Sequence, residues 1–441
     1  MNQNWVKITT IFFLVLGVLA STINSWNAEY FGLQNATVAA LVERGTFALV
    51  DQVIPGFNLV EGTETFRFGK NIYPMKQPGG TILGALVYAP LYKVNFKYTN
   101  HFDYVSHFVT FFTSSLLVAL SSILIYLIAK EIGVRPNIAI LGSFLYPFAT
   151  IVWPYAGVSH HDIYGSFWVL AAIYLFYKSQ KDNKYNYLLI AGICSTLSLF
   201  FTMLPLTFTI VLWGILVARR KLLPILSYSI GAIIGFLPNM IFNGVVFGNP
   251  LLPPNLAGKV SDTMPLLSLT NLAQKLWFYL LSPTTSLFVF SPILIFGMIG
   301  IWKLRRSEPL LHKILLYVPI IHLLHISSIE TFGGYQYGPR YLLPIIACLI
   351  IGVVKWIQNP RSKFANILFG VSLVWSVIVS IVGAIQTVMY PMPGPFAPIT
   401  LANQILIGKM PEFRMLPLGI ILILVGTFAF GINKIQASNR K

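Results

Sequence analysis

Glu29 is the residue of this chain that is most informative about its chemistry. It stands in the sequence Trp26-Asn27-Ala28-Glu29-Tyr30, directly after the first apolar segment and at the head of a long polar stretch. A carboxylate at the rim of an apolar span is costly to hold there, which makes it a functional candidate. It can accept a proton from a reacting hydroxyl group; the ordinary explanation is a solvated acid or a helix cap.

Two cations in other polar segments have the chemistry to bind a phosphate. Lys76 lies between two prolines in the segment 73–80, and Arg340 follows a Gly-Pro pair at the start of an apolar run. Arginine offers a planar fork that suits phosphate oxygens, and lysine offers a mobile point charge. Each also has an ordinary explanation, because Lys76 could be a surface lysine near lipid headgroups and Arg340 could be a snorkelling arginine.

A third cluster contains His160, His161 and Asp162. Neighbouring residues in a helix diverge by about 100°, so both histidines cannot face one site. One histidine could join Asp162 and Glu29 in a metal site, but we favour a helix N-terminus capped by Asp162 or a contact with an acceptor. Tyr335 and Tyr337, in the segment 333–341, could stack on a sugar ring or could belong to the aromatic belt of a membrane protein.

Membrane-spanning helices must position these residues. The chain of 441 residues is 56% hydrophobic and only 10% charged, whereas soluble domains carry about 25% charged residues. We expect an all-α polytopic membrane protein, one membrane-embedded domain over 1–441, whose first apolar run is a retained span and not a signal peptide. Hydropathy predicts about twelve spans, at 8–25, 104–129, 137–155, 163–178, 186–203, 204–218, 223–244, 286–302, 314–329, 339–357, 364–388 and 415–433.

The basic residues lie on one side of this arrangement. If the N-terminus is cytoplasmic, the cytoplasmic segments hold 19 of the 30 Lys and Arg residues but only three of the thirteen acids. This distribution follows the positive-inside rule and puts both termini in the cytoplasm. The net charge of +17 therefore indicates topology and contact with anionic lipid rather than nucleic-acid binding. The cytoplasmic connectors are too short for a nucleotide-binding domain.

The other side carries the other ten acids and the long polar segments, 26–103, 245–285 and 389–414. In the first of these, residues 30–49 are expected to form an amphipathic helix at the membrane surface. Residues 50–72 are expected to be irregular or to form short strands. The apolar run 82–92 is too short to span easily and predicts a second interfacial or re-entrant helix. We expect the chemistry on this side, where there is no ATP or nucleotide-sugar.

The order of motifs along most of the chain resembles the GT-C superfamily of membrane glycosyltransferases, in particular its protein mannosyltransferases and aminoarabinose transferase-like members. The resemblance begins with a carboxylate after the first span and with interfacial helices in the long first extracytoplasmic loop. The KQP segment looks like the KPP segment of arabinose- and mannose-transferring members. The quoted motifs, of which the last is the most specific, are KQPGG, LVYAPLY, TIVWPYAGVSHHD, NGVVFGNPL, LLSPTTSLFVFSP and GGYQYGPRYLLPI.

This resemblance implies inverting transfer of a sugar from a polyprenyl phosphate to an acceptor hydroxyl or amine. The implied location is the extracytoplasmic face of a prokaryotic inner or plasma membrane. It assigns Glu29 as the general base and Lys76 and Arg340 as ligands of the donor phosphate. The residues expected to bind substrate are His160, His161, Asp162, Tyr335 and Tyr337.

One departure from the family pattern concerns metal binding. Many members carry two adjacent acids after the first span, whereas Ala28 precedes Glu29 here. A hard cation needs several oxygen ligands, so no cofactor is expected, and a divalent metal is not favoured. The expected partners are a polyprenyl-phosphate sugar donor, a glycan, lipid or protein acceptor, and membrane lipid, with no nucleic acid.

Two other functions fit parts of the sequence. A transporter or flippase of a lipid-linked or small substrate also suits twelve spans, but such proteins tend to keep polar groups at mid-membrane and to show repeats. This chain has its charges at one rim and no evident repeat. A glycan polymerase or ligase would also use lipid-linked sugars, and the donor would distinguish it.

Overall fold

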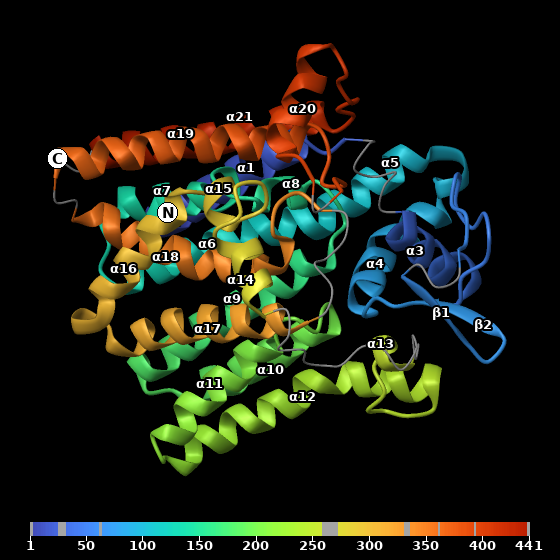
Figure 1. Ribbon diagram of the computed structural model, residues 1–441, viewed down its shortest axis with the longest axis horizontal. Coiled ribbons are helices and arrows are strands. Elements are labelled where there is room, and N and C mark those ends of the chain that lie inside the picture. Colours follow the sequence, from blue (N-terminus) through green and yellow to red (C-terminus); the bar gives the residue numbers. More distant parts are fainter. Residues whose placement is uncertain are drawn as a thin grey trace.

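The computed structural model describes residues 3–24, 32–60, 64–257, 272–329, 336–359, 362–391 and 394–438. Most of these residues form helices, and the long ones run side by side in one bundle (Figure 1). In chain order the α-helices are α1 (Gln3–Ser21), α3 (Gly32–Arg44), α4 (Gly79–Lys93), α5 (Tyr98–Thr110), α6 (Leu116–Glu131), α7 (Pro136–Phe148), α8 (Val152–Ala156), α9 (His161–Asp182), α10 (Tyr185–Leu197), α11 (Leu206–Ala218), α12 (Leu222–Phe247), α13 (Pro254–Ala257), α14 (Leu272–Leu280), α15 (Leu287–Phe290), α16 (Ile293–Ser307), α17 (Pro309–Ser328), α18 (Leu343–Gln358), α19 (Lys363–Ile385), α20 (Ala397–Leu406) and α21 (Leu416–Ser438). The shorter elements are the strands β1 (Thr65–Phe68) and β2 (Asn71–Pro74) and the helical turns η1 (Phe111–Ser115), η2 (Ser198–Phe200) and η3 (Arg340–Leu342).

Each of the twelve predicted spans coincides with helix in the structure. Six described helices are long and apolar enough to cross a membrane, and three shorter apolar helices accompany them. Two predicted spans are interrupted. One breaks between α7 and α8, and the other breaks at Ser291 because the proline that follows it disfavours helical φ and ψ there. The chain is an integral membrane protein with an all-α fold.

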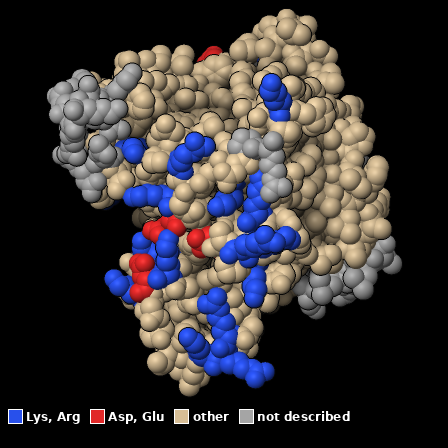
Figure 2. Space-filling view, turned by 90° about the vertical axis from the view of Figure 1, so that its left-hand side faces the viewer, with Lys and Arg blue, Asp and Glu red and all other residues tan. Residues whose placement is uncertain are grey.

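The predicted cytoplasmic connectors meet at one end of the bundle. The Arg135 guanidinium donates to the carbonyl oxygen of Gln358 over 3.3 Å, and the Lys303 ammonium donates to that of Asn359 over 3.1 Å. Loops far apart in the sequence thus share this face. Figure 2 shows Lys and Arg side chains spread over it with few acids among them. We call it the basic face.

The long first loop gathers at the opposite end, where α3, α4, α5 and the two strands lie together (Figure 1). The helix predicted over 30–49 is observed as α3. The sequence predicts that it lies at the membrane surface by itself, but it packs against α4 and α5. Gln34, Asn35 and Thr37 of α3 are buried. Thr37 accepts a hydrogen bond from Thr81 of α4 over 3.1 Å, and Asn35 accepts one from the Tyr98 hydroxyl over 3.1 Å. The pattern of apolar residues could not show these polar contacts.

The strands β1 and β2 form an antiparallel hairpin that packs on the end of α12. The rings of Phe66, Phe68 and Tyr73 lie 5.8, 5.2 and 5.8 Å from the ring of Phe247. Aromatic contacts at such distances are stabilising beyond their buried area. Phe247 therefore anchors the hairpin to the bundle, and the short strands expected within 50–72 are confirmed, extending to residue 74.

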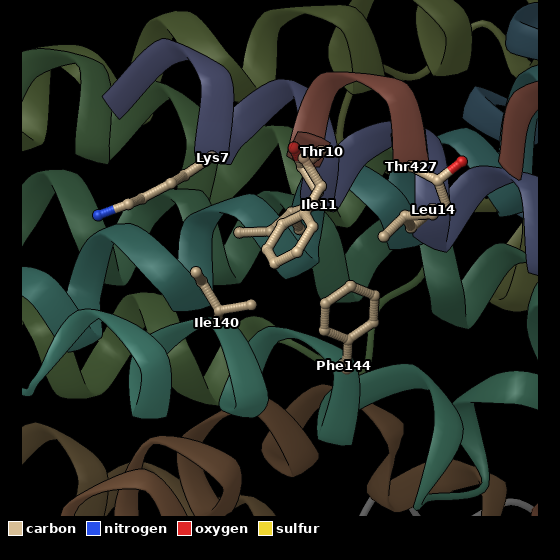
Figure 3. A pocket seen from close by; sticks show the side chains of 8 residues that line it. Lys7, Thr10, Ile11, Leu14, Ile140, Phe144 and Thr427 are labelled. Atoms are coloured by element: carbon tan, nitrogen blue, oxygen red, sulfur yellow. The ribbon is translucent and has the colours of Figure 1, made fainter. Parts of the chain in front are cut away.

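A groove between α1, α7 and α21 carries Lys7 at one end (Figure 3). The other side chains along it are mainly apolar. Its two threonines donate to carbonyl oxygens of their own helices, Thr10 to Val6 and Thr427 to Leu424, each over 2.9 Å. This groove offers apolar surface and a single cation, so it lacks the converging polar groups of a catalytic site. The lining residues are Lys7, Thr10, Ile11, Leu14, Ile140, Phe144, Thr427 and Phe430.

Candidate active site

Lys76 follows the hairpin, and a carboxylate meets it from the other side. Thr65 pairs with Pro74 in the strand ladder, and the Met75 amide donates to the Glu64 carbonyl oxygen over 2.8 Å. The chain segments before and after the hairpin therefore stay adjacent. The Lys76 Nζ lies 3.1 Å from Glu64 Oε1. The hairpin fixes both members of this ion pair.

The glycines after Lys76 bring this segment against the bundle. A Cβ on Gly79 would come within 2.5 Å of the Phe200 carbonyl oxygen, so this approach requires glycine. Gly80 lies against the ring of Tyr164 in α9, where a Cβ would stand at 3.0 Å. Because α9 begins with the predicted histidine–aspartate cluster, this packing holds Lys76 near that cluster.

His160 and Asp162 are both fully buried at the start of α9. The cap is His160, whose Nδ1 accepts from the Asp162 amide over 3.2 Å. The predicted capping role of Asp162 is therefore wrong: Asp162 lies inside the first turn and its carboxylate is directed elsewhere. Its Oδ1 accepts from the Thr202 hydroxyl over 3.0 Å, and its Oδ2 has no hydrogen-bond partner among the described residues.

Arg340 is a buried cation at the start of η3, with 9% of its surface exposed. The preceding Gly338 has a φ of +71°, and a Cβ there would meet Phe290 at 3.0 Å, so glycine is required at this turn. The Arg340 Nε has no hydrogen-bond partner among the residues that the structure describes. A buried guanidinium with an unsatisfied donor is costly, which points to an anionic ligand.

Tyr155 links the Arg340 segment to the histidine cluster. Its hydroxyl oxygen accepts from the Tyr337 amide over 3.0 Å, and its ring lies 4.9 Å from that of His160, edge to face. Segments near residues 76, 160 and 340, which are far apart in sequence, therefore converge at one place. This place lies at the end of the bundle opposite the basic face.

Charges within this cluster act on one another. The Lys76 ammonium holds the pKa of the Glu64 carboxyl below its usual value, and Arg340 adds to this effect. Burial lowers the pKa of Lys76, while Glu64 opposes that shift and Arg340 reinforces it. Burial, with the positive charges of Arg340 and Lys76, brings the pKa of His160 well below its usual value. His160 is therefore a neutral imidazole at pH 7, and the two cations are the positive groups of the cluster.

The sequence also predicts Glu29, Tyr335 and Tyr337 as site residues. Glu29 and Tyr335 lie outside the described residues, so their roles stay predictions. Tyr337 is fully buried, with its ring 5.1 Å from that of Phe290 and its hydroxyl donating to the Val379 carbonyl oxygen over 2.6 Å. In this structure the Tyr337 side chain packs in the core, and a role in binding sugar stays a prediction.

Glu64 is a member of the cluster that the sequence did not single out. Its contact with Lys76 depends on the register of a hairpin of two four-residue strands. The signal was present, since TFRF and NIYP flank Gly69-Lys70 as two strands flank a turn. Extending that register by one residue at each end places Glu64 opposite Met75, the neighbour of Lys76.

His160, His161 and Asp162 could also hold a cation. One ligand atom from each lies within 4.8 Å of the others. The rings of the two histidines are stacked with centroids 4.6 Å apart, so the expectation that both cannot face one site is wrong. His160 is the cap, with a φ of −126°, and the angular spacing of helical residues does not apply to it. The positive charges of Lys76 and Arg340 act on this cluster and raise the cost of placing a divalent cation there. The same charges suit an anion better than a metal.

Part of the chain matches a known protein family. Residues 99–242 match the family model of dolichyl-phosphate-mannose-protein mannosyltransferases. This stretch contains the histidine–aspartate cluster. No curated protein matches the chain in sequence.

Two solved structures resemble the chain. The crystal structure of ArnT from Cupriavidus metallidurans bound to undecaprenyl phosphate superposes with a TM-score of 0.50 and 13% identity, over 98% of this chain and 77% of that one. The structure of the same protein in the apo state gives a TM-score of 0.49 and 12% identity, over 96% of this chain and 75% of that one. The family model matches residues 99–242 only, and the first of these structures shows the fold: the chain shares the helical fold of that ArnT structure.

Proposed function

We propose that this protein transfers a sugar from a polyprenyl phosphate to an acceptor hydroxyl or amine, with inversion at the anomeric carbon, on the extracytoplasmic face of a prokaryotic inner or plasma membrane. The observation that carries the proposal is the buried cation Arg340, which acts electrostatically on Lys76 at the end of the bundle opposite the basic face. This arrangement suits a phosphate held at a membrane surface.

The phosphate assignment rests on the donors that Arg340 and Lys76 offer. The Arg340 Nε is unsatisfied among the described residues, and the Lys76 side chain, which is 22% exposed, interacts electrostatically with Arg340. Hydrogen bonds from such charged groups to phosphate oxygens are stronger than hydrogen bonds between neutral groups. The bound undecaprenyl phosphate in the ArnT crystal structure supports a polyprenyl phosphate as the lipid.

The reaction needs one base and one stabilised leaving group. The acceptor oxygen or nitrogen attacks the anomeric carbon, the bond from that carbon to the phosphate oxygen breaks, and the polyprenyl phosphate leaves with the bonding electrons. The Glu29 carboxylate takes the acceptor proton. Lys76 and Arg340 stabilise the negative charge that develops on the phosphate. A single attack from the face opposite the leaving group inverts the configuration.

The remaining residues of the cluster would bind the acceptor or the sugar. His161 keeps some exposure beside the buried Asp162 carboxylate, so these two can hydrogen-bond hydroxyl groups. Neutral His160 fixes the start of α9. We propose that the reaction requires no metal, because two cations already neutralise the departing phosphate. The acceptor is a glycan, a lipid or a protein.

The orientation follows from the charges. The basic face belongs in the cytoplasm by the positive-inside rule, with both termini on that side. The cluster then faces away from nucleotides, which agrees with a lipid-linked donor. The polyprenyl chain would lie against the helices while its phosphate reaches Lys76.

A reconstituted transfer assay tests this function. The purified full chain in lipid vesicles is given radiolabelled polyprenyl-phosphate sugars and a mixture of envelope glycans and glycolipids. Release of polyprenyl phosphate with a glycosylated product of inverted configuration is the expected result, and Glu29→Gln should lower the rate at least about 100-fold. Movement of intact donor across the membrane without product would overturn the proposal in favour of a flippase. Full transfer by Glu29→Gln would remove Glu29 from its role.

A further inference from the structure

The Glu64 carboxylate occupies the place where an incoming phosphate would find its cations. It lies 3.1 Å from the Lys76 ammonium and acts electrostatically with Arg340. The reaction proposed above does not use it. A carboxylate beside the phosphate-binding cations repels the donor, so its position needs an explanation.

The backbone holds Glu64 in this position. Its φ is +58°, in the left-handed region that glutamate rarely adopts. The Met75 amide bonds to its carbonyl oxygen over 2.8 Å, directly beyond the strand ladder. These backbone contacts do not involve the carboxylate. Replacing the carboxylate by an amide therefore leaves the hairpin in place.

The two members of the pair differ in their access to water. The Glu64 side chain is 53% exposed, whereas that of Lys76 is 22% exposed. The carboxylate can therefore rotate into water while the ammonium stays in the cluster. Glu64 pairs with Lys76 and leaves the Arg340 Nε without a hydrogen-bond partner among the described residues. An anion that binds both cations would therefore accept more hydrogen bonds than Glu64 does. A phosphate is such an anion.

The donor and the product carry different charges, and this difference explains why a carboxylate that competes for Lys76 is useful. A sugar linked to a polyprenyl phosphate is a phosphodiester with one negative charge. The released polyprenyl phosphate is a monoester whose second pKa is about 6, so it carries between one and two negative charges at pH 7. Lys76 and Arg340 alone would therefore hold the product more tightly than the donor. A carboxylate that returns to Lys76 offsets this preference.

We propose that Glu64 is an internal counterion that occupies the phosphate position in the empty site, yields it to the donor, and returns to expel the polyprenyl phosphate product. This inference rests on the proposed function, since it assumes that Lys76 and Arg340 bind a lipid phosphate. Glu64 is thus a positioning residue, and it touches the cation rather than the reacting atoms. Its removal strengthens binding and slows product release.

Binding of undecaprenyl phosphate to the purified full chain in nanodiscs is the test. Glu64→Gln should bind it about fivefold more tightly than the unaltered protein, a ratio equivalent to about 1 kcal/mol. In steady-state transfer the same variant should show a lower KM and a lower kcat, because product release slows. The gain in affinity should disappear in the double variant that also carries Lys76→Gln. A residue with a merely structural role would weaken binding when replaced.

Glu412→Gln is the matched control. Glu412 is another acid of the predicted outer segments, is 70% exposed and pairs with Arg414 over 2.7 Å. This variant also removes one negative charge, but at a position away from Lys76. It should bind undecaprenyl phosphate with the same affinity as the unaltered protein. Inorganic phosphate in a separate arm should compete more weakly than undecaprenyl phosphate, which distinguishes a lipid phosphate site from a free anion site.

The outcomes separate the two proposals. If the unaltered protein binds undecaprenyl phosphate and Glu64→Gln binds it equally or more weakly, the counterion role is wrong and the proposed function stands. If Glu64→Gln abolishes transfer with a saturating donor while binding improves, Glu64 is a base and the counterion role is also wrong. If no form of the protein binds undecaprenyl phosphate, both proposals are overturned.

Discussion

Arg340 is the residue on which the phosphate assignment most depends. Its side chain is 9% exposed and its Nε has no partner among the described residues. Arg340→Ala should lower kcat/KM for transfer at least about 100-fold, because the leaving phosphate loses a preorganised charge. Arg340→Lys should recover part of this loss, since lysine keeps the charge but not the planar fork.

Arg414→Ala serves as the control for Arg340. Arg414 pairs with Asp103 over 2.9 Å and with Glu412 over 2.7 Å. The Arg414→Ala variant therefore removes a paired arginine that lies outside the cluster. Transfer by this variant should stay within about twofold of the unaltered enzyme, as for other surface ion pairs. Equal losses in the two arginine variants would show that Arg340 contributes only stability.

The pKa of Glu64 predicts a pH dependence for its effect on binding. Lys76 holds this pKa below 4.5, so the ion pair is present at pH 7 and is lost as the pH falls through the lowered value. The difference in undecaprenyl phosphate affinity between Glu64→Gln and the unaltered protein should therefore be full at pH 7 and narrow only below about pH 4.5. Titration of both proteins side by side checks this. A difference that closes between pH 8 and 6 would point to another group.

Sequence reasoning identified Lys76, Arg340 and Asp162 separately, and the structure brings them together. The chemistry of each side chain and its place at the rim of a span were readable from the sequence. The Glu64 contact required a further step, because it depends on the register of the predicted hairpin and not on the type of a single residue. The choice of His160 over Asp162 as cap depends on the backbone at one position, where helix boundaries are hardest to predict.

At the scale of elements, the β1–β2 hairpin positions Lys76, and Phe247 of α12 anchors it. Three hairpin rings contact the Phe247 ring at 5.2 to 5.8 Å. Truncation of a buried phenylalanine to alanine lowers the free energy of unfolding by about 3 to 5 kcal/mol when the cavity does not collapse. Phe247→Ala should therefore loosen the hairpin and weaken undecaprenyl phosphate binding about tenfold.

Phe430→Ala is the comparison for the hairpin variant. Phe430 lines the groove that contains Lys7, away from the hairpin, and should leave binding unchanged. Thermal unfolding of both variants shows whether a loss of binding accompanies loss of the whole bundle. Unaltered binding by Phe247→Ala would contradict the anchoring role.

Element positions were largely predictable because long apolar runs determine where helices can span. The interruption at Ser291 and the buried polar face of α3 were harder to predict, since both depend on contacts between distant segments. Asn35 and Thr37 look like surface residues in the sequence. Their partners Tyr98 and Thr81 belong to other helices.

For the whole molecule, the charge asymmetry predicts which end faces the cytoplasm. Lys184, after α9, belongs to the basic face, and Thr99, in α5, lies at the other end; both are exposed. In intact cells a membrane-impermeant thiol reagent should label Thr99→Cys, and it should label Lys184→Cys only after permeabilisation. The natural Cys194 and Cys348 are buried and give little background. Labelling of both positions from the same side would contradict the topology.

Whether a lipid phosphate binds between Lys76 and Arg340 can be seen in a structure of the full chain with undecaprenyl phosphate. Cryo-electron microscopy of the complex in nanodiscs should place the phosphorus within hydrogen-bonding reach of the Lys76 ammonium and the Arg340 guanidinium, with the Glu64 carboxylate turned away. A phosphate located instead beside Lys7, in the groove at the basic end, would contradict the account.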